Sequence, residues 1–330
     1  MAEPTIILTR QQIESQVDIV AAIPAIEHAM GQFEKGEDYL PPKGLFQIPV
    51  EATGALAACI TGYTKATNLL SMKVGQERTD NPKRGLPTTN SWIAAFNPDT
   101  GELMMFCDGT LPTMYRTASA AAVSAKHLAR HDATVLAVIG AGQLGRQCIR
   151  AVSSVRKFKT VYVYDVVEQA AQRAASDLAP QVEADIEVAD AQTACSRADV
   201  VATATNSRQP IVMSDWIQSG THLCCMGSDL HEKIECEMKL LTRCRLFADF
   251  VEHALQRGEV SQAVEKGVLN NDCYTGSLGQ VINGQLPGRT DDEHITMYDG
   301  VGIGIQDTTI ARSIYDQASA KKLGTRIAFS

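Results

Sequence analysis

The chain has 330 residues, more than one ordinary domain requires, so its length predicts two domains. Hydrophobic residues make up 45% of the chain and charged residues 21%, a balance typical of folded globular proteins and unlike that of disordered ones. A net charge of −8, without a run of Lys and Arg, argues against nucleic acid or an anionic membrane as a partner.

The N-terminus and the cysteines bear on the cellular compartment. Residues 1–4 lack the basic and apolar blocks of a signal peptide, and no apolar run is long enough to span a membrane. The nine cysteines have no regular spacing, which suits reduced thiols. Cys224 and Cys225 are adjacent and lack the spacing of a zinc site. We therefore expect a cytoplasmic protein without a membrane segment or a bound metal.

The first third of the chain predicts a mixed segment of helices and strands. Apolar residues at helical spacing predict an amphipathic helix within residues 8–36, while residues 55–62 and 91–107 have the composition of strands. The turn residues 97–101 divide the second of these stretches into a hairpin. An alanine-rich helix is expected over residues 116–130, where it would connect the two domains.

From residue 134 onward, short apolar runs alternate with helical segments. Strands are expected at residues 134–139, 160–164, 199–204, 222–226 and 245–249. Helices are expected at residues 143–155, 168–178, 235–242, 250–265 and, after a glycine-rich stretch, 309–320. This alternation predicts βαβ units and a doubly wound parallel sheet, which places the chain in the α/β class.

A glycine-rich turn follows the first of these strands. The strand at residues 134–139 runs directly into Gly140, Gly142 and Gly145, which have the G-x-G-x-x-G spacing, and a helix follows. Gly140 permits a tight turn, Gly142 lets a pyrophosphate approach the backbone, and Gly145 allows close packing of helix and strand. The helix N-terminus then offers N–H donors to the phosphates. The turn therefore predicts a dinucleotide-binding site.

Asp165 ends the next expected strand, 20 residues after Gly145. A carboxylate at this position accepts hydrogen bonds from the ribose hydroxyls of the adenosine and repels a 2′-phosphate. Val166 and Val167 supply no compensating arginine, so NAD(H) is favoured over NADP(H). The alternative interpretation is a turn without a ligand, in which Asp165 only caps the next helix.

Cations of the first domain are candidates for an anion site, and they are Lys43, Lys73, Arg78, Lys83, Arg84 and Arg116. Lys73 ends the apolar stretch at residues 69–73, which would carry it inward on a strand. Arg116 begins the alanine-rich helix, where a guanidinium would hold a carboxylate through a bidentate pair. Taken one at a time, the other four are interpreted as solvated surface residues.

Asp229 follows the expected strand at residues 222–226 and therefore lies at the carboxyl edge of the sheet, where doubly wound folds bind ligands. There it would donate or accept a proton near a nicotinamide ring. The alternative interpretation is a loop carboxylate or a helix cap. His222, within the strand, is interpreted as a core histidine whose hydrogen bonds are satisfied.

Several segments together resemble the ornithine cyclodeaminase/mu-crystallin family, and the resemblance covers nearly the whole chain. They are residues 40–43, 72–74, 85–89, 111–117, 138–143, 226–229 with Lys233, 278–288, and 301–302 with Asp307. The resemblance implies a Rossmann-type NAD-binding domain at residues 123–304, inserted into an α+β substrate-binding and dimerisation domain. Residues 1–122 and 305–330 would form that second domain. The resemblance further implies a homodimer and chemistry on an amino or imino acid.

The resemblance also implies roles for single residues. Lys43, Lys73 and Arg116 would hold the substrate carboxylate, with Lys73 also taking part in catalysis, and Asp229 would act on the substrate nitrogen. Nicotinamide ribose or phosphate contacts are implied for Thr88, Thr89, Arg116 and Thr117. Further cofactor contacts are expected from Gly140, Gly142, Gln143, Leu144, Gly145, Asp165, Thr203, Ala204, Thr205, Asp229, Lys233 and Gly302.

The charged residues also bear on the substrate. The excess of cations, without a matching acid, suits a small dicarboxylic imino acid such as iminosuccinate, whose reduction by NADH yields L-aspartate. The resemblance to the ornithine-cyclising members of the family implies an acidic residue in an early strand that holds the substrate amine, but residues 54–60 contain none, which argues against a diamine. The alternatives are a cyclodeaminase that uses NAD⁺ catalytically, an enzyme similar to alanine dehydrogenase, and a non-enzymatic NAD(P)H- or ligand-binding protein similar to mu-crystallin.

Overall fold

The computed structural model describes residues 4–15, 18–47, 55–78 and 80–329. The chain forms two compact units, one of Met1–Arg116 with Ile303–Ser330 and the other of Thr117–Gly302. It passes from the first unit to the second inside helix α3 (Thr110–Leu128) and returns after Gly302. These boundaries lie a few residues from those expected, and the roles assigned to the two parts stay predictions. No helix of the described residues is long and apolar enough to cross a membrane.

The first unit is built on a seven-stranded mixed sheet in the order β15-β1-β6-β5-β4-β3-β2. β1 pairs with β6 in parallel, and the other neighbouring pairs are antiparallel. The strands are β1 (Thr5–Leu8), β2 (Gly44–Gln47), β3 (Ala55–Thr64), β4 (Leu69–Arg78), β5 (Thr89–Phe96), β6 (Leu103–Asp108) and β15 (Thr325–Ile327). The expected hairpin is therefore confirmed as β5 and β6.

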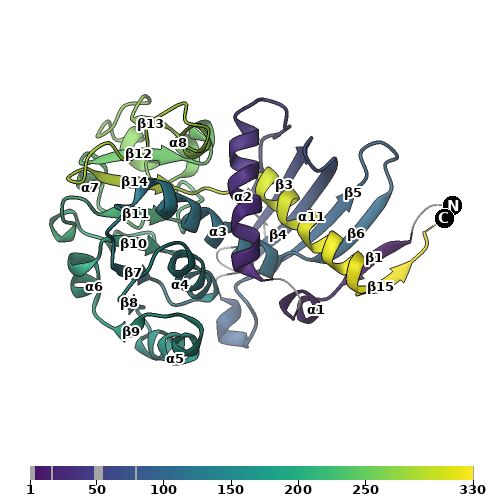
Figure 1. Ribbon diagram of the computed structural model, residues 1–330, viewed down its shortest axis with the longest axis horizontal. Coiled ribbons are helices and arrows are strands. Elements are labelled where there is room, and N and C mark those ends of the chain that lie inside the picture. The colour runs from purple at the N-terminus through teal and green to yellow at the C-terminus, as the bar shows by residue number, and fades with distance from the viewer. Residues whose placement is uncertain (1–3, 16–17, 48–54, 79, 330) are drawn as a thin grey trace. The chain divides into compact units, whose positions relative to one another are not determined.

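Two helices, α2 (Ile19–Phe33) and α11 (Gly304–Lys321), cover one face of this sheet (Figure 1). α11 begins directly on β3, because a Cβ atom at Gly62 would lie only 2.5 Å from the backbone carbonyl carbon of Gly304. Glycine is thus required where the helix meets the strand. This close approach lays the first turn of α11 against β3 and β4.

The alternation along β4 decides which of its side chains reach the helices. Ser71 and Lys73 are buried, whereas Met72 and Val74 are 40% and 45% exposed. The pattern follows from the period of two in an extended strand that is covered on one face. The prediction that a strand carries Lys73 inward is confirmed.

Two helices of the first unit differ from expectation. Residues 8–36 form two helices, α1 (Arg10–Glu14) and α2, because Asp18 caps the N-terminus of a new helix. The helix expected at residues 309–320 already begins at Gly304. Gly304, the last glycine of the stretch that suggested a loop there, is needed for the close packing on β3, because a Cβ on it would collide with the carbonyl oxygen of Thr61.

The second unit is built on an eight-stranded sheet in the order β13-β12-β14-β11-β10-β7-β8-β9, and all neighbouring strands are parallel. The strands are β7 (Val135–Ile139), β8 (Thr160–Tyr164), β9 (Asp185–Val188), β10 (Val200–Thr203), β11 (His222–Cys225), β12 (Cys244–Ala248), β13 (Tyr274–Ser277) and β14 (Ile295–Asp299). From β7, the sheet extends to β8 on one side and to β10 on the other. This is the predicted doubly wound α/β arrangement, and such folds bind ligands at the carboxyl edge beside the reversal.

Helices cover both faces of the parallel sheet (Figure 1). They are α4 (Gln143–Val155), α5 (Glu168–Leu178), α6 (Ala191–Arg197), α7 (Met238–Leu241), α8 (Val251–Arg257), α9 (Ser261–Glu265) and α10 (Leu278–Ile282). Leu223 and Cys225 of β11 join a core that includes residues of α6, α7 and α9. His222 and Cys224 point to the opposite face, where both contact Ser124 of α3. His222 is therefore a core histidine with a hydrogen-bond partner, as predicted.

The end of the second unit departs most from expectation. The helix expected at residues 235–242 is limited to α7, and the one expected at 250–265 is split into α8 and α9. Gly258 separates them, because a Cβ there would collide with Oδ2 of Asp299. Three strands of the sheet, β9, β13 and β14, were not expected. β9 is an exposed edge strand with two acidic residues, so it lacks the apolar pattern of the other strands.

Candidate functional site

The turn between β7 and α4 has the geometry that a pyrophosphate requires. Gly140 has a φ of +104°, and a Cβ there would lie 2.7 Å from the carbonyl oxygen of Ala204. A Cβ at Gly145 would collide with the carbonyl oxygen of Gly140, so α4 packs directly on the turn. At Gly142, no described atom lies within 4 Å of a Cβ position, and no side chain caps the helix. Backbone N–H donors thus face open space, and the residues present fit a bound dinucleotide.

Asp165 stabilises this turn from the end of β8. Its Oδ2 accepts a hydrogen bond from the backbone N of Ala141 at 2.8 Å, and its Oδ1 accepts one from Val167 N at 2.8 Å. Val167 is the N-cap residue of α5, so Asp165 is not the cap that the alternative interpretation required. A carboxylate oxygen accepts more than one hydrogen bond, so both oxygens keep capacity for ribose hydroxyls.

Glu235 organises the same edge of the sheet and was not expected in the site. It is fully buried, and its Oε2 accepts from Thr203 Oγ1 at 2.5 Å and from Gly227 N at 2.9 Å. Its Oε1 accepts from the backbone N and Oγ1 of Thr205, at 2.7 and 2.8 Å. Burial raises the pKa of Glu235, and these hydrogen bonds offset part of the rise. The hydroxyls of Thr203 and Thr205, expected at the cofactor, therefore already bind a carboxylate.

Asp229 lies in the loop after β11 and is held by a buried cation. Lys233 Nζ contacts Asp229 Oδ1 at 2.9 Å and Asn206 Oδ1 at 3.2 Å. The side chain of Lys233 is 6% exposed, whereas that of Asp229 is 49% exposed. Arg257 of α8 is a second positive charge that interacts with Asp229. The carboxylate of Asp229 is thus fixed on its inner side and accessible on its outer side.

The candidate substrate site of the first unit is a buried ion cluster. Asp307 Oδ1 accepts a hydrogen bond from Lys73 Nζ at 2.8 Å and another from Arg116 Nε at 3.2 Å. Arg116 Nη1 also donates to Gln306 Oε1 at 3.3 Å. Lys73, Arg116 and Asp307 are 4%, 6% and 0% exposed. The structure therefore brings the two principal cations together, on an acid of α11 to which no role had been assigned.

The charges of this cluster change the pKa values of Lys73 and Asp307. Burial lowers the pKa of Lys73 to about 8, although Asp307 raises it, and Arg116 and Lys43 add to the lowering. Burial raises the pKa of Asp307, but the charges of Lys73, Arg116 and Lys43 outweigh it and hold that pKa below its ordinary value. Lys43, which directly precedes β2, thus acts on both members of the buried pair.

The remaining cations lie outside this cluster. Arg84 pairs with Asp80 at 2.9 Å on the surface, and Arg78 donates to the carbonyl oxygen of its neighbour Glu77. Lys83 is exposed. The expectation that the cations have no matching acid is wrong, because Asp307 pairs with Lys73 and Arg116 and Asp80 pairs with Arg84. In the buried cluster, two cations still share one acid.

The other residues expected at the cofactor are distributed over both units. Thr88 and Thr89 lie half-buried at the start of β5 in the first unit. In the second unit, Thr117 is buried in α3, and the backbone N of Gly302 donates to Asp249 Oδ2 at 2.6 Å. Gln143 and Leu144 form the first turn of α4. The cofactor contacts of this set stay predictions.

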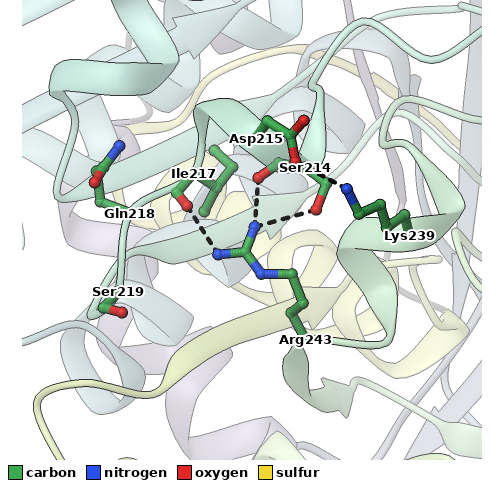
Figure 2. A pocket seen from close by; sticks show the side chains of 7 residues that line it. All are labelled: Ser214, Asp215, Ile217, Gln218, Ser219, Lys239 and Arg243. Atoms are coloured by element: carbon green, nitrogen blue, oxygen red, sulfur yellow. Dashed lines mark hydrogen bonds and ion pairs between the residues drawn. The ribbon is translucent and has the colours of Figure 1, made fainter.

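A surface pocket of the second unit lies at the opposite edge of the sheet, before β11 and β12 (Figure 2). Arg243 donates to the carbonyl oxygens of Ser214 and Ile217, the latter at 3.1 Å, and Lys239 pairs with Asp215 at 3.0 Å. Both cations of the pocket are therefore bound by groups of the protein itself. We assign this pocket no function.

The doubly wound sheet, the open glycine turn and the acid at the end of the second strand define a dinucleotide-binding α/β protein. Comparison with known proteins makes the assignment more specific. A family model described as the ornithine cyclodeaminase/mu-crystallin family matches residues 3–322. This chain belongs to that family.

Relatives of known structure or activity match over the whole length. The iminosuccinate reductase of Paracoccus denitrificans is 31% identical over 98% of this chain and 99% of that protein. An archaeal alanine dehydrogenase dimer with bound NAD is similar with a TM-score of 0.93, at 32% identity over 99% of both chains. The Δ1-pyrroline-2-carboxylate reductase of Thermococcus litoralis, with NADH and L-proline, has a TM-score of 0.94 at 26% identity, covering 98% of this chain and 100% of that one.

Proposed function

We propose that the chain uses NADH to reduce a small dicarboxylic imino acid, with iminosuccinate as the first candidate and L-aspartate as its product. The chain is an NAD-dependent oxidoreductase of amino or imino acids, in line with relatives that share its length and fold. The proposal adds the substrate and the preference for NADH over NADPH.

The charge of the buried cluster supports a dicarboxylate. Lys73 and Arg116 are buried and positive, and Asp307 contacts both, so Asp307 balances only one of the two charges of this buried pair. Buried charge is costly unless it is compensated. One substrate carboxylate completes this balance, and Lys43, whose charge acts on both Lys73 and Asp307, is our candidate for binding the second carboxylate of a dicarboxylic substrate.

The surroundings of Asp165 support NADH. A 2′-phosphate on the ribose would approach this carboxylate, and the next two residues, Val166 and Val167, are 88% and 51% exposed. Neither offers a positive charge to that phosphate. The hydroxyl of NADH, by contrast, is a donor to the same oxygens.

The residues of the chain divide the work of the reduction between them. NADH, when bound, supplies the hydride that reduces the carbon of the C=N bond. Lys73 and Arg116 bind the substrate carboxylate and so fix the orientation of the imine, which contributes much of the rate in such reactions. Asp229 passes a proton to the imine nitrogen, directly or through water, as the carbon is reduced. Lys233 holds Asp229 in place and stabilises the carboxylate that remains.

A screen of substrates by NADH absorbance tests this proposal. We expect the fastest NADH oxidation with oxaloacetate plus ammonium, which form iminosuccinate, and slower oxidation with pyruvate plus ammonium or with Δ1-pyrroline-2-carboxylate. A faster reaction with either of the latter would overturn the dicarboxylate assignment. Release of ammonia from ornithine or lysine without net NADH oxidation would indicate a cyclodeaminase, and no reaction at all would indicate a binding protein.

We also propose that the chain acts as a homodimer. The face of the first sheet that α2 and α11 leave uncovered carries the exposed side chains of Met72, Val74, Trp92 and Phe106. Val74 and Trp92 are cross-strand partners on β4 and β5. Exposed apolar clusters of this kind mark interaction surfaces. A second copy of the chain is the occupant that the dimeric archaeal relative supports.

A further inference from the structure

Asp307 is an acid that is completely buried. It lies in the first turn of α11 and is 0% exposed. Its Oδ1 binds both Lys73 and Arg116, while its Oδ2 is buried without a hydrogen-bond partner among the described residues. An unpartnered buried carboxylate oxygen is costly, so its retention requires an explanation.

Helix capping does not explain Asp307. Gln306 supplies the side-chain contact to the helix N-terminus, because its Oε1 accepts from Ile303 N at 3.5 Å. Among the described residues, Asp307 instead binds two side chains from distant parts of the sequence, Lys73 on β4 and Arg116 on α3. Nε2 of Gln306 is likewise buried without a partner among the described residues. One unused acceptor and one unused donor therefore lie beside the two cations.

We propose that Asp307 is a positioning residue of the carboxylate site, whose single oxygen Oδ1 fixes Lys73 and Arg116 relative to one another so that both face the same anion. This inference rests on the proposed role of Lys73 and Arg116 in binding the substrate carboxylate. Two cations this close would otherwise repel each other and turn apart. The carboxylate between them removes that repulsion without occupying the second terminal nitrogen of Arg116, Nη2, so the guanidinium can still bind a ligand.

Asp307 also keeps Lys73 charged. The charged groups that act on Lys73 are Asp307 from α11, Arg116 from α3 and Lys43 before β2, and its cross-strand neighbours Ile60 and Ile93 are apolar. Asp307 alone raises the pKa of Lys73, whereas burial and the two cations lower it. Without Asp307, Lys73 loses its proton at a lower pH. As the pH rises, a carboxylate that needs a charged Lys73 therefore binds more weakly. This loss of affinity begins at a lower pH than in the wild-type protein.

The test compares Asp307→Asn with wild type in the full-length protein loaded with NADH. KM is measured from pH 6.5 to 9 with the imino acid that wild type reduces fastest. If no imino acid is reduced, the dissociation constant of succinate is measured instead by calorimetry. We expect the ratio of KM at pH 8.5 to KM at pH 6.5 to rise about tenfold in the variant, as for a drop of one pKa unit, with a smaller change in kcat. A wild-type ratio would overturn the proposal.

Two further variants distinguish a role of Asp307 in positioning Lys73 and Arg116 from an effect on folding. Thr308→Val is the matched control, because Thr308 is the next residue of α11, is equally buried and hydrogen-bonds Ser71 at 2.7 Å. It is expected to lower thermal stability without moving the pH ratio. Asp307→Glu keeps the charge but displaces it by one methylene, so KM should rise at all pH values with a nearly normal ratio. If Asp307→Asn does not fold, a Glu variant with wild-type KM would overturn the proposal.

The positioning role of Asp307 can fail independently of the proposed function. A substrate other than iminosuccinate would overturn the dicarboxylate assignment, yet the pH ratio of Asp307→Asn would still be measured with that substrate. Failure of wild type to bind either succinate or any imino acid would overturn both. If the ratio of KM at pH 8.5 to KM at pH 6.5 rose equally in Asp307→Asn and in Thr308→Val, the effect would be structural, and the positioning role of Asp307 would be overturned.

Discussion

Asp165 and Asp229 are both carboxylates at the carboxyl edge of the parallel sheet, but their partners give them different tasks. Asp165 accepts hydrogen bonds from two backbone N–H groups, which fix it as a rigid acceptor beside the glycine turn. Asp229 is bound by the ammonium of Lys233 and is half exposed. The first arrangement suits recognition of a hydroxyl, and the second suits exchange of a proton.

Replacement of Asp165 tests the assignment of the cofactor. In Asp165→Ala, we expect the dissociation constant of NADH to rise about tenfold or more and the preference over NADPH to fall, because a charged acceptor is lost. Fluorescence titration with both cofactors measures the two effects. Asp190→Ala is the control, since that carboxylate caps α6 through Thr193 N at 2.8 Å and lies outside the proposed site. An unchanged preference in Asp165→Ala would remove Asp165 from the cofactor site.

Replacement of Asp229 tests the path of the proton. Asp229→Asn keeps an oxygen for Lys233 but cannot release a proton, so turnover is expected to fall by roughly 10²–10⁴-fold with nearly normal NADH affinity. Steady-state kinetics and NADH titration distinguish these effects. Asp215→Asn is the matched control, because Asp215 also pairs with a lysine, Lys239, at 3.0 Å, yet lies at the opposite edge of the sheet. Normal turnover in Asp229→Asn would exclude the residue from the mechanism.

The structure added two acids that sequence reasoning had not assigned to the site, and the reasons differ. Asp307 had a signal, because Ile310 and Ile314 follow it at helical spacing and an acid on an apolar stripe is unusual. A helix expected to begin at residue 309 hid that stripe. Glu235 had no such signal, since its four hydrogen bonds come from the end of β10 and from two loops that are adjacent only in the folded sheet.

At the scale of elements, Glu235 connects the loops that follow β10 and β11. Its oxygens hold Thr203 at the end of β10, Thr205 on the loop that follows it and Gly227 on the loop after β11. Glu259 in turn accepts from the backbone N of Glu235 at 2.9 Å, and burial raises the pKa of Glu259 well above its ordinary value. Buried acids thus link the loops at this part of the carboxyl edge of the sheet.

Glu235→Gln should loosen both loops. In glutamine, an NH2 group replaces one oxygen of the carboxylate. This NH2 group is a donor, so it cannot accept the hydrogen bonds of the two N–H or O–H donors that face that oxygen in the wild-type protein. We expect a loss of about 2 kcal/mol in the free energy of unfolding, measured with denaturant, and weaker NADH binding. Glu237→Gln is the control, because Glu237 accepts from Ser214 N at the opposite edge. Equal effects of the two variants on NADH affinity would contradict a local role for Glu235.

The elements that could be predicted are those with a local signal. β7, the glycine turn and α4 were located within a residue, because strand, turn and helix each have their own pattern within a few residues. β13 (Tyr274–Ser277) contains a glycine and no apolar run, so its sequence gives little strand signal. β14 (Ile295–Asp299) was missed although all its residues are buried. The break between α8 and α9 was missed because it depends on contact of Gly258 with Asp299 of β14.

For the whole molecule, the uncovered face of the first sheet predicts the behaviour in solution. We expect a homodimer at micromolar concentration by light scattering. Trp92→Glu places a charge on the 43% exposed side chain at this face and should yield monomers. Val188→Glu changes a similarly exposed residue, 39%, on the edge strand of the other unit and should leave the dimer intact. A wild-type monomer would exclude the proposal, as would a dimer that tolerates Trp92→Glu.

The order of segments along the chain has a consequence for biosynthesis. The second unit lies within one continuous stretch, whereas the first needs α11 and β15, which a ribosome makes only after the whole second unit. During translation, β4 and the start of α3 therefore emerge with Lys73 and Arg116 long before Asp307 exists to neutralise them. Until then, two cations that are buried in the folded protein must stay in water, and the first sheet lacks α11, one of the two helices that cover it. The nascent first unit is thus an expected client of chaperones, while the second is free to fold as it emerges.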